Sequence, residues 1–146
     1  FEYGSGSSTL YFGSKVGEVM SVEYDPKWFD KVQGLIDGTT NVEVHFIDLN
    51  GPYVDAIEVL GKGKKFDLVI VDGRERVACA IKAFDFVSQN GVVLLDDTHR
   101  QHYQDAFDFY RSKCWKALTF SGLKPTGFGM DQSTLFYRSG QNCLDL

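Results

Sequence analysis

Two glycines and a glutamate near the start of the chain are spaced as a nucleotide-binding turn requires. The segment Phe1–Ser7 reads F-E-Y-G-S-G-S, in which Gly4 and Gly6 allow a tight turn and a close backbone approach, because neither has a Cβ. Glu23 follows Gly4 by nineteen positions (23 − 4), a spacing that suits a carboxylate accepting hydrogen bonds from two ribose hydroxyls. These residues predict a βαβ unit that binds an adenosine cofactor.

The residues around the turn favour one adenosine cofactor over another. A dinucleotide-binding turn carries a third glycine, which accommodates the pyrophosphate at the helix N-terminus, and here Thr9 takes that position. Glu2, two residues before Gly4, is placed to accept a hydrogen bond from an ammonium group. A carboxylate there suits the cationic amino-acid end of S-adenosylmethionine (SAM) better than a pyrophosphate. The sequence therefore favours SAM over NAD, and a turn without any ligand is the alternative.

Five presumed strands each end in an acidic residue, and these acids form a candidate site. Ligands of parallel sheets lie at the carboxyl ends of the strands, so acids at these ends are expected to meet at one edge. Aspartate is also a common helix cap and turn former, so individual members could be caps only. The acids are Glu2, Glu23, Asp48, Asp72 and the pair Asp96-Asp97.

Basic residues follow the last two of these strand ends. Guanidinium groups match the geometry of carboxylates and phosphates, so Arg74, Arg76 and Arg100 are candidates for binding an anionic small molecule. Alternatively, they pair with the neighbouring acids and hold the loops. His99 is a candidate general base, because an unperturbed imidazole titrates near neutral pH, although a loop histidine is more often merely exposed.

The elements that position these residues alternate between strands and helices, which predicts a doubly wound α/β fold with a mostly parallel sheet. Strands are expected at residues 1–3, 15–23, 42–47, 66–71, 92–95, 116–120 and 133–138. Helices are expected at residues 10–12, 26–37, 53–60, 77–87 and 103–113. The near-continuous apolar run at residues 66–71 is typical of a strand buried on both faces. No internal repeat or linker divides the sequence.

Composition and charge narrow the class of protein. A chain of 146 residues with 43% hydrophobic content is expected to form a single domain around one core. The net charge of −5 and the pI near 5.1 disfavour binding to nucleic acid or to an anionic membrane. No apolar run approaches the roughly 20 residues needed to span a bilayer, and no secretion signal is recognisable.

The cysteines and the first residue set further expectations. Cys79, Cys114 and Cys143 are odd in number and lack C-x-x-C spacing, which argues against a disulfide framework or a zinc site and for a reducing compartment. A cytoplasmic location is the default expectation. Phe1 already falls inside the presumed first strand, so residues 1–146 are interpreted as an N-terminally truncated domain.

Four segments together resemble the class I SAM-dependent methyltransferases. E-x-G-x-G-S at residues 2–7 and V-E-Y-D-P at 22–26 match the first two motifs of that family. F-D-L-V-I-V-D-G at 66–73 and N-G-V-V-L-L-D-D at 90–97 match its fourth and fifth strands, with Asn90 where the family usually has glycine. The resemblance implies a seven-stranded Rossmann-like sheet whose last strand is antiparallel. V-D-G-R-E-R and L-D-D-T-H-R are similar to segments of a bacterial group of methyltransferase-like proteins.

The resemblance also implies how the cofactor is held. Glu23 would bind the ribose, and Asp48 would lie at the adenine edge. The residues that would contact the methionine part or line the pocket are Glu2, Gly4, Ser5, Gly6, Ser7, Tyr24 and Asp72.

A narrower resemblance, to the catechol and caffeoyl-CoA O-methyltransferases, implies a divalent metal. Those enzymes hold it with an Asp after the fourth strand and an Asp-Asn pair after the fifth, where this chain has Asp72, Asp96 and Asp97. Oxygen ligands of this kind suit Mg²⁺ or Ca²⁺. The family's catalytic Lys is replaced by Glu75, which puts the catechol-type mechanism in doubt. The alternative is that Asp72 lines the cofactor pocket and the Asp pair caps a loop.

The implied activity is methyl transfer from SAM to a small-molecule acceptor, at oxygen. The acceptor is expected between residues 72–74 and 96–99, with a loop at 120–122 as the far wall. The candidate catalytic residues are Asp72, Asp96 and His99. The candidate acceptor-binding residues are Arg74, Arg76, Asp97 and Arg100, which suit an anionic acceptor. The alternatives are an NAD-dependent oxidoreductase and a non-catalytic methyltransferase-like binding module.

Overall fold

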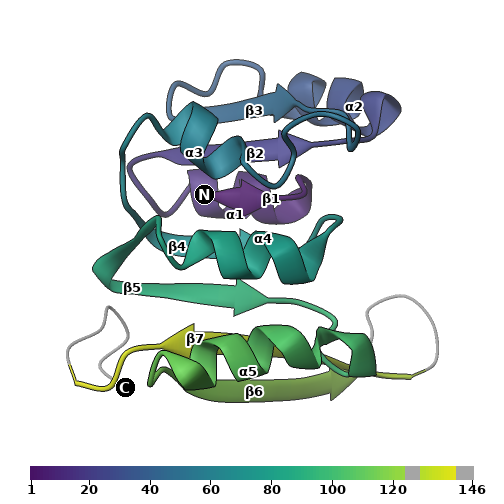
Figure 1. Cartoon of the computed structure of the whole chain (residues 1–146). Helices are drawn as coiled ribbons and strands as arrows, with labels where there is room; N and C mark the ends of the chain where they lie inside the picture. Colours follow the sequence, from purple (N-terminus) through teal and green to yellow (C-terminus); the bar gives the residue numbers. More distant parts are fainter. Residues whose placement is uncertain (124–128, 141–146) are drawn as a thin grey trace.

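A seven-stranded sheet in the order β3-β2-β1-β4-β5-β7-β6 runs through the computed structural model, which describes residues 1–123 and 129–140 (Figure 1). Its strands are β1 (Glu2–Tyr3), β2 (Val19–Glu23), β3 (Val42–Phe46), β4 (Phe66–Val71), β5 (Val87–Leu95), β6 (Lys116–Leu123) and β7 (Met130–Tyr137). Neighbouring strands are parallel except around β7, which is antiparallel to β5 and to β6. The predicted fold, a mostly parallel sheet with an antiparallel last strand, is confirmed.

Helices connect the strands and cover both faces of the sheet. They are α1 (Ser7–Gly13), α2 (Pro26–Ile36), α3 (Ala56–Gly61), α4 (Arg76–Ala83), the 3-10 turn η1 (Gln101–Tyr103) and α5 (Gln104–Ser112). Helices α3, α4 and α5 pack on one face, whereas α1 and α2 pack on the other (Figure 1). Within the described residues, no helix has the length and apolar character that crossing a membrane requires.

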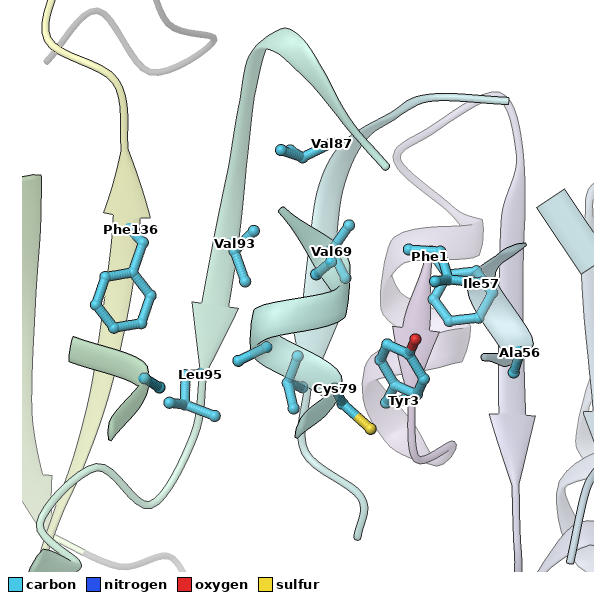
Figure 2. Packing of buried hydrophobic residues seen from close by; sticks show 14 of the residues in the cluster. Phe1, Tyr3, Ala56, Ile57, Val69, Cys79, Val87, Val93, Leu95 and Phe136 are labelled. Carbon is cyan, nitrogen blue, oxygen red and sulfur yellow. The ribbon is translucent and has the colours of Figure 1, made fainter. Parts of the chain in front are cut away.

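The larger core lies between the sheet and helices α3, α4 and α5 (Figure 2). Cys79, Ala80 and Ala83 on α4 are fully buried, and their small side chains let the helix lie close to the strands. The ring of Tyr110 on α5 stacks on that of Phe136 on β7, with centroids 4.3 Å apart. This packing fixes the carboxyl ends of β4 and β5, where several candidate site residues lie.

Helix α2 begins where its sequence predicts. One carboxylate oxygen of Asp25 accepts hydrogen bonds from the backbone N–H groups of Lys27 (2.9 Å) and Trp28 (3.1 Å). Pro26, at the first helical position, has no N–H that would need a partner. The cap therefore fixes the chain directly after Glu23, at the edge where β1 and β2 end.

Strand β2 and helix α4 are among the elements that are shorter than the sequence predicted. Strand β2 begins at Val19 rather than at residue 15, because turn hydrogen bonds continue beyond α1, including one from Lys15 N–H to the Phe12 carbonyl. Helix α4 ends at Ala83 rather than at residue 87. The chain then turns so that the carbonyl of Phe86 accepts from the N–H of Phe66, the first residue of β4.

Strands β5 and β6 are longer than predicted, as is β7, which begins at Met130 rather than at residue 133. Strand β5 begins at Val87, which pairs with Phe66, but the next pair joins Val92 to Leu68, so residues 88–91 bulge out of register. Residues 89–91, which precede the strand predicted at 92–95, belong to this bulge. Strand β6 continues to Leu123, paired throughout with β7. The prediction of a loop at residues 120–122 was therefore wrong, because these residues complete the final hairpin.

The turns after β1 and β4 are in direct backbone contact. Gly4 has a φ of +91°, and a Cβ there would lie 2.9 Å from Cα of Gly73. A Cβ on Gly73 would overlap the hydroxyl oxygen of Tyr53 and lie 3.0 Å from the backbone nitrogen of Gly4. Gly4 thus serves a close approach to a neighbouring turn; the approach to a ligand that the sequence assigns to Gly4 stays a prediction.

We expect Gly73→Ala to lower the free energy of unfolding by about 1–3 kcal/mol, because the added methyl group forces the two turns apart. The added variant Tyr53→Phe should restore part of the loss by removing the overlapping hydroxyl. Gly34→Ala is the matched control: nothing lies within 4 Å of a Cβ at this exposed helical position, so this change should stabilise the fold slightly. Urea denaturation measures all three; equal stability of Gly73→Ala and the unmodified protein would contradict the contact.

Candidate functional site

A polar cleft of about 360 Å³ lies at the carboxyl ends of β1, β2 and β4. This is the edge of the sheet at which the arrowheads of β1 and β2 end in Figure 1. The predicted cofactor residues that line it are Gly4, Ser5, Glu23, Tyr24 and Asp72. Its other lining residues are Ser8, Asp25, Trp28, Gly73, Arg74 and Arg76. The cleft therefore joins the first two sequence motifs to the end of the fourth strand.

Glu23 lies at the end of β2 and is only 3% exposed. One carboxylate oxygen accepts from the backbone N–H groups of Tyr24 and Asp25, both at 2.9 Å. The other accepts from the backbone N–H (3.1 Å) and the hydroxyl (3.0 Å) of Ser5. Donors from two turns thus surround one buried carboxylate, which holds the glycine turn against the end of β2 and against the cleft.

Glu2, two residues before Gly4, does not line the cleft. Its carboxylate is 2% exposed and accepts from the hydroxyls of Ser8, Thr9 and Ser21, the last at 2.6 Å. Thr9 also accepts from the N–H of Gly6 at 2.9 Å. The residue at the third-glycine position is therefore a structural partner of Glu2. A serine inside the apolar strand V-M-S-V-E was the sequence signal for this cluster.

Three other predicted cofactor residues lie outside the cleft lining. Ser7 and Asp48 are exposed, and Asp48 accepts from the backbone N–H (2.8 Å) and the side-chain amide (2.9 Å) of Asn50. Gly6 is buried beside Trp28, whose indole ring lies 3.7 Å from where a Cβ would be. The indole N–H of Trp28 donates to the carbonyl of Ser5 at 2.7 Å. The sequence predicted only a helix at the position of Trp28, so its place in the cleft wall was missed.

The predicted metal ligands do meet, but around an arginine. The guanidinium of Arg76 lies 2.9 Å from a carboxylate oxygen of Asp72 and 3.3 Å from one each of Asp96 and Asp97. Ser133 on β7 donates to the other oxygen of Asp96 at 2.6 Å. One largely covered guanidinium therefore contacts three carboxylates from the ends of β4 and β5.

The carboxyl group of Asp72 responds most strongly to this crowding. Partial burial raises the pKa of Asp72 to about 7, and the charges of Asp96 and Asp97 add to the increase, as does a hydrogen bond with Asp96. The charge of Arg76 opposes the shift without cancelling it. Asp72 consequently keeps a proton up to near neutral pH, in a hydrogen bond with Asp96 beside the cleft.

His99 lies next to β7. It lines neither the cleft nor a second cavity, which adjoins the cleft between the start of α4 and η1. Its Nδ1 lies 3.0 Å from a carboxylate oxygen of Asp131. Possible metal-ligating atoms of Asp97, His99 and Asp131 all lie within 4.8 Å of one another. Among residues 1–123 and 129–140, no other group of three His, Cys, Asp or Glu side chains is this close together. Asp97 already pairs with Arg76 and Arg100, so two guanidinium groups compete for its carboxylate.

A second cavity, of about 540 Å³, adjoins the cleft between the start of α4 and η1. The predicted acceptor-binding residues Arg74, Arg76 and Arg100 line it together, and Asp97 lies behind them as a partner of the last two. Residues 120–122 contribute to neither hollow. The structure thus groups the three arginines as the sequence predicted, but beside α4 rather than toward β6.

Comparison with known proteins supports the fold on structure alone. No family model matches the sequence, and neither does any curated protein. An O-methyltransferase from Bacillus cereus, solved with S-adenosylhomocysteine (SAH), superposes with a TM-score of 0.74 at 18% identity, over 94% of this chain and 72% of that one. The O-methyltransferase TomG from Streptomyces achromogenes, solved with SAM, gives 0.73 at 19% identity, over 95% and 72%.

A third similar structure carries a different acceptor chemistry. The N-methyltransferase NodS from Bradyrhizobium japonicum, solved with SAH, superposes with a TM-score of 0.68 at 9% identity, over 95% of this chain and 76% of that one. The likeness therefore extends across oxygen and nitrogen methyltransferases. With its strand order and these likenesses, the chain has the Rossmann-like fold of the class I SAM-dependent methyltransferases.

Proposed function

We propose that the chain binds SAM in the cleft and transfers its methyl group to the oxygen of a small-molecule acceptor. The observation that carries the proposal is the buried carboxylate of Glu23 at the cleft, tied to the glycine turn through Ser5. Solved proteins of the same fold hold SAM or SAH. When SAM binds, its ribose hydroxyls would replace the hydroxyl of Ser5 as hydrogen-bond donors to Glu23.

The other cofactor contacts follow from this placement of the ribose. Gly4 and Ser5 would face the methionine part, Tyr24 and Asp72 would line the pocket, and Asp48 would lie at the adenine edge. Glu2 would act on this site indirectly, because its carboxylate already holds the hydroxyls of Ser8 and Thr9. Gly6 and Ser7 would contribute backbone geometry at the start of α1.

Methyl transfer to oxygen needs a nucleophile and a route for its proton. SAM supplies an electrophilic methyl group on a sulfonium. Asp72, which forms a hydrogen bond with Asp96, would accept the proton of the acceptor hydroxyl, since a carboxylate with a pKa near 7 is matched to proton transfer at neutral pH. Arg76 would keep the pair in place, and in-line positioning would supply much of the rate. His99, outside both hollows, would act only at the rim.

Positive charge among the three aspartates is supplied by Arg76, so we propose no Mg²⁺ at this position. An NAD-dependent oxidoreductase is not favoured, because the third-glycine position holds the buried side chain of Thr9. A binding module without turnover is separated from the enzyme by assaying methyl transfer directly.

The first test is cofactor binding. Calorimetry should show that SAM and SAH bind and that NAD binds more weakly or not at all. Glu23→Ala should weaken SAH binding by about 1.5–3 kcal/mol, the scale of hydrogen bonds to a charged group. Glu43→Ala, at an exposed carboxylate on β3, is the control and should keep full affinity. Tighter binding of NAD than of SAH would overturn the proposal, and unchanged SAH affinity in a folded Glu23→Ala protein would move the ribose contact elsewhere.

The second test uses the pKa of Asp72. Because that pKa is raised from 3.8 to about 7, the folded protein holds a proton between these values that the unfolded chain has released. The associated stability is complete at the acidic end and is lost as pH rises through 7. Asp72→Asn cannot ionise, so its stability should fall less from about pH 5 to about pH 8, by about 1 kcal/mol after allowing for solvent screening. Urea titrations measure this, with Asp108→Asn on α5 as control; parallel pH profiles of Asp72→Asn and the unmodified protein would contradict it.

The third test concerns the cation among the aspartates. Arg76→Ala leaves three carboxylates without their shared guanidinium, so MgCl₂ should raise the melting temperature of this variant more than NaCl of equal ionic strength does. The unmodified protein should show no such difference. Arg111→Ala, at an exposed arginine on α5, controls for loss of positive charge. A magnesium-specific stabilisation of the unmodified protein would show that Arg76 leaves room for a metal.

A further inference from the structure

The cavity beside α4 combines cationic and apolar walls. Apolar side chains of Val77, Ala78 and Ile81 come from one face of α4, and Tyr103 comes from η1. The charged residues that line it, within the described part of the chain, are three cations, Arg74, Arg76 and Arg100, and one anion, Glu75. A hollow with this lining favours a compound that has both an apolar body and a negative charge.

The three arginines differ in how much of their charge is already compensated. Arg76 is shared among three aspartates, and Arg100 pairs with Asp97. Arg74 has no carboxylate within salt-bridge distance among residues 1–123 and 129–140. Its Nε donates to the hydroxyl of Tyr24 at 3.0 Å, and its guanidinium lies 5.3 Å from the centre of that ring. Arg74 is therefore an oriented cation that is free to pair with a ligand.

Arg74 also lies on the boundary between the two hollows. It lines the cleft at the ends of β1, β2 and β4, and it lines the cavity beside α4. Arg76, which holds Asp72 and Asp96, lies on the same boundary. An anion bound to Arg74 from the α4 side would thus keep the rest of its molecule close to the proposed proton acceptor.

We propose that the acceptor is an oxyanion with an apolar body, which occupies the cavity beside α4. Its carboxylate or phosphate pairs with Arg74, and Arg100 strengthens the positive field at the same wall. The apolar part lies on Val77, Ala78 and Ile81, and the hydroxyl that is methylated points toward Asp72. This inference rests on the proposed methyl transfer, because it places the acceptor relative to the cofactor cleft.

The test compares charged and neutral forms of one compound. The probes are p-hydroxybenzoate and p-hydroxybenzamide, which differ in charge but share the ring and the hydroxyl, and phenyl phosphate as a second oxyanion. Affinities are measured by calorimetry on the whole chain at saturating SAH. We expect one of the two anions to bind about fivefold more tightly than the amide, the scale of a partly exposed charge pair. The preference should weaken as NaCl is added.

Variants at Arg74 assign the preference to this residue. Arg74→Gln should bring the affinity of the anion to that of the amide, and Arg74→Lys should restore part of the difference because it restores the charge. Lys116→Gln, at an exposed lysine on β6, is the control and should keep the full preference. Comparing the affinities of p-hydroxybenzoate and phenyl phosphate shows whether a carboxylate or a phosphate is the preferred group.

Each outcome separates this inference from the proposed function. If SAH binds but neither anion binds more tightly than the amide, or if Arg74→Gln keeps the preference, the anionic acceptor is overturned and the cofactor site stands. If SAH itself does not bind, the proposed methyl transfer is overturned first.

Discussion

The buried carboxylate of Glu23 is the interaction on which the cleft depends. Burying a charge is costly unless donors surround it, and here the donors come from the turn after β1 and from the chain after β2. Moving either turn would leave the charge without a partner, so the two motifs are held in one arrangement. The contact between Gly4 and Gly73 extends this constraint to β4. The edge of the sheet is thereby preorganised for a ligand.

A second charge, the guanidinium of Arg76, organises the next two strand ends. Three carboxylates at the ends of β4 and β5 would repel one another, and one cation on the first turn of α4 contacts all three, with Arg100 as a second partner of Asp97. Compensation is incomplete, because the pKa of Asp72 remains raised to about 7. The same arrangement leaves Arg74 without a carboxylate partner in the described chain. Arg76 thus holds the aspartates together, whereas Arg74, two residues earlier, keeps a positive charge with which a ligand can pair.

The acidic strand ends show where sequence reasoning reached its limit. The pattern grouped Glu2 with Glu23, since each acid ends a strand beside the glycine turn. The two side chains have different surroundings: Glu2 accepts from hydroxyls of α1 and β2, whereas Glu23 lines the cleft. Asp72, Asp96 and Asp97 do meet, as predicted, but the sequence left open whether a metal or an arginine lay among them. Spacing along a chain cannot show which charge fills a shared space.

The sequence was sufficient to predict the alternation of strands and helices, the order of the motifs and the acids that end the strands, because apolar periodicity and glycine placement are local properties. It also indicated the antiparallel last strand through its resemblance to a family. The tertiary structure was needed to reveal the bulge in β5, the full length of β6 and the place of Trp28 in the cleft wall. It also decided that Arg76 lies among the aspartates while Arg74 rests on Tyr24. These features depend on contacts between residues distant in the chain, for which no local pattern carries the information.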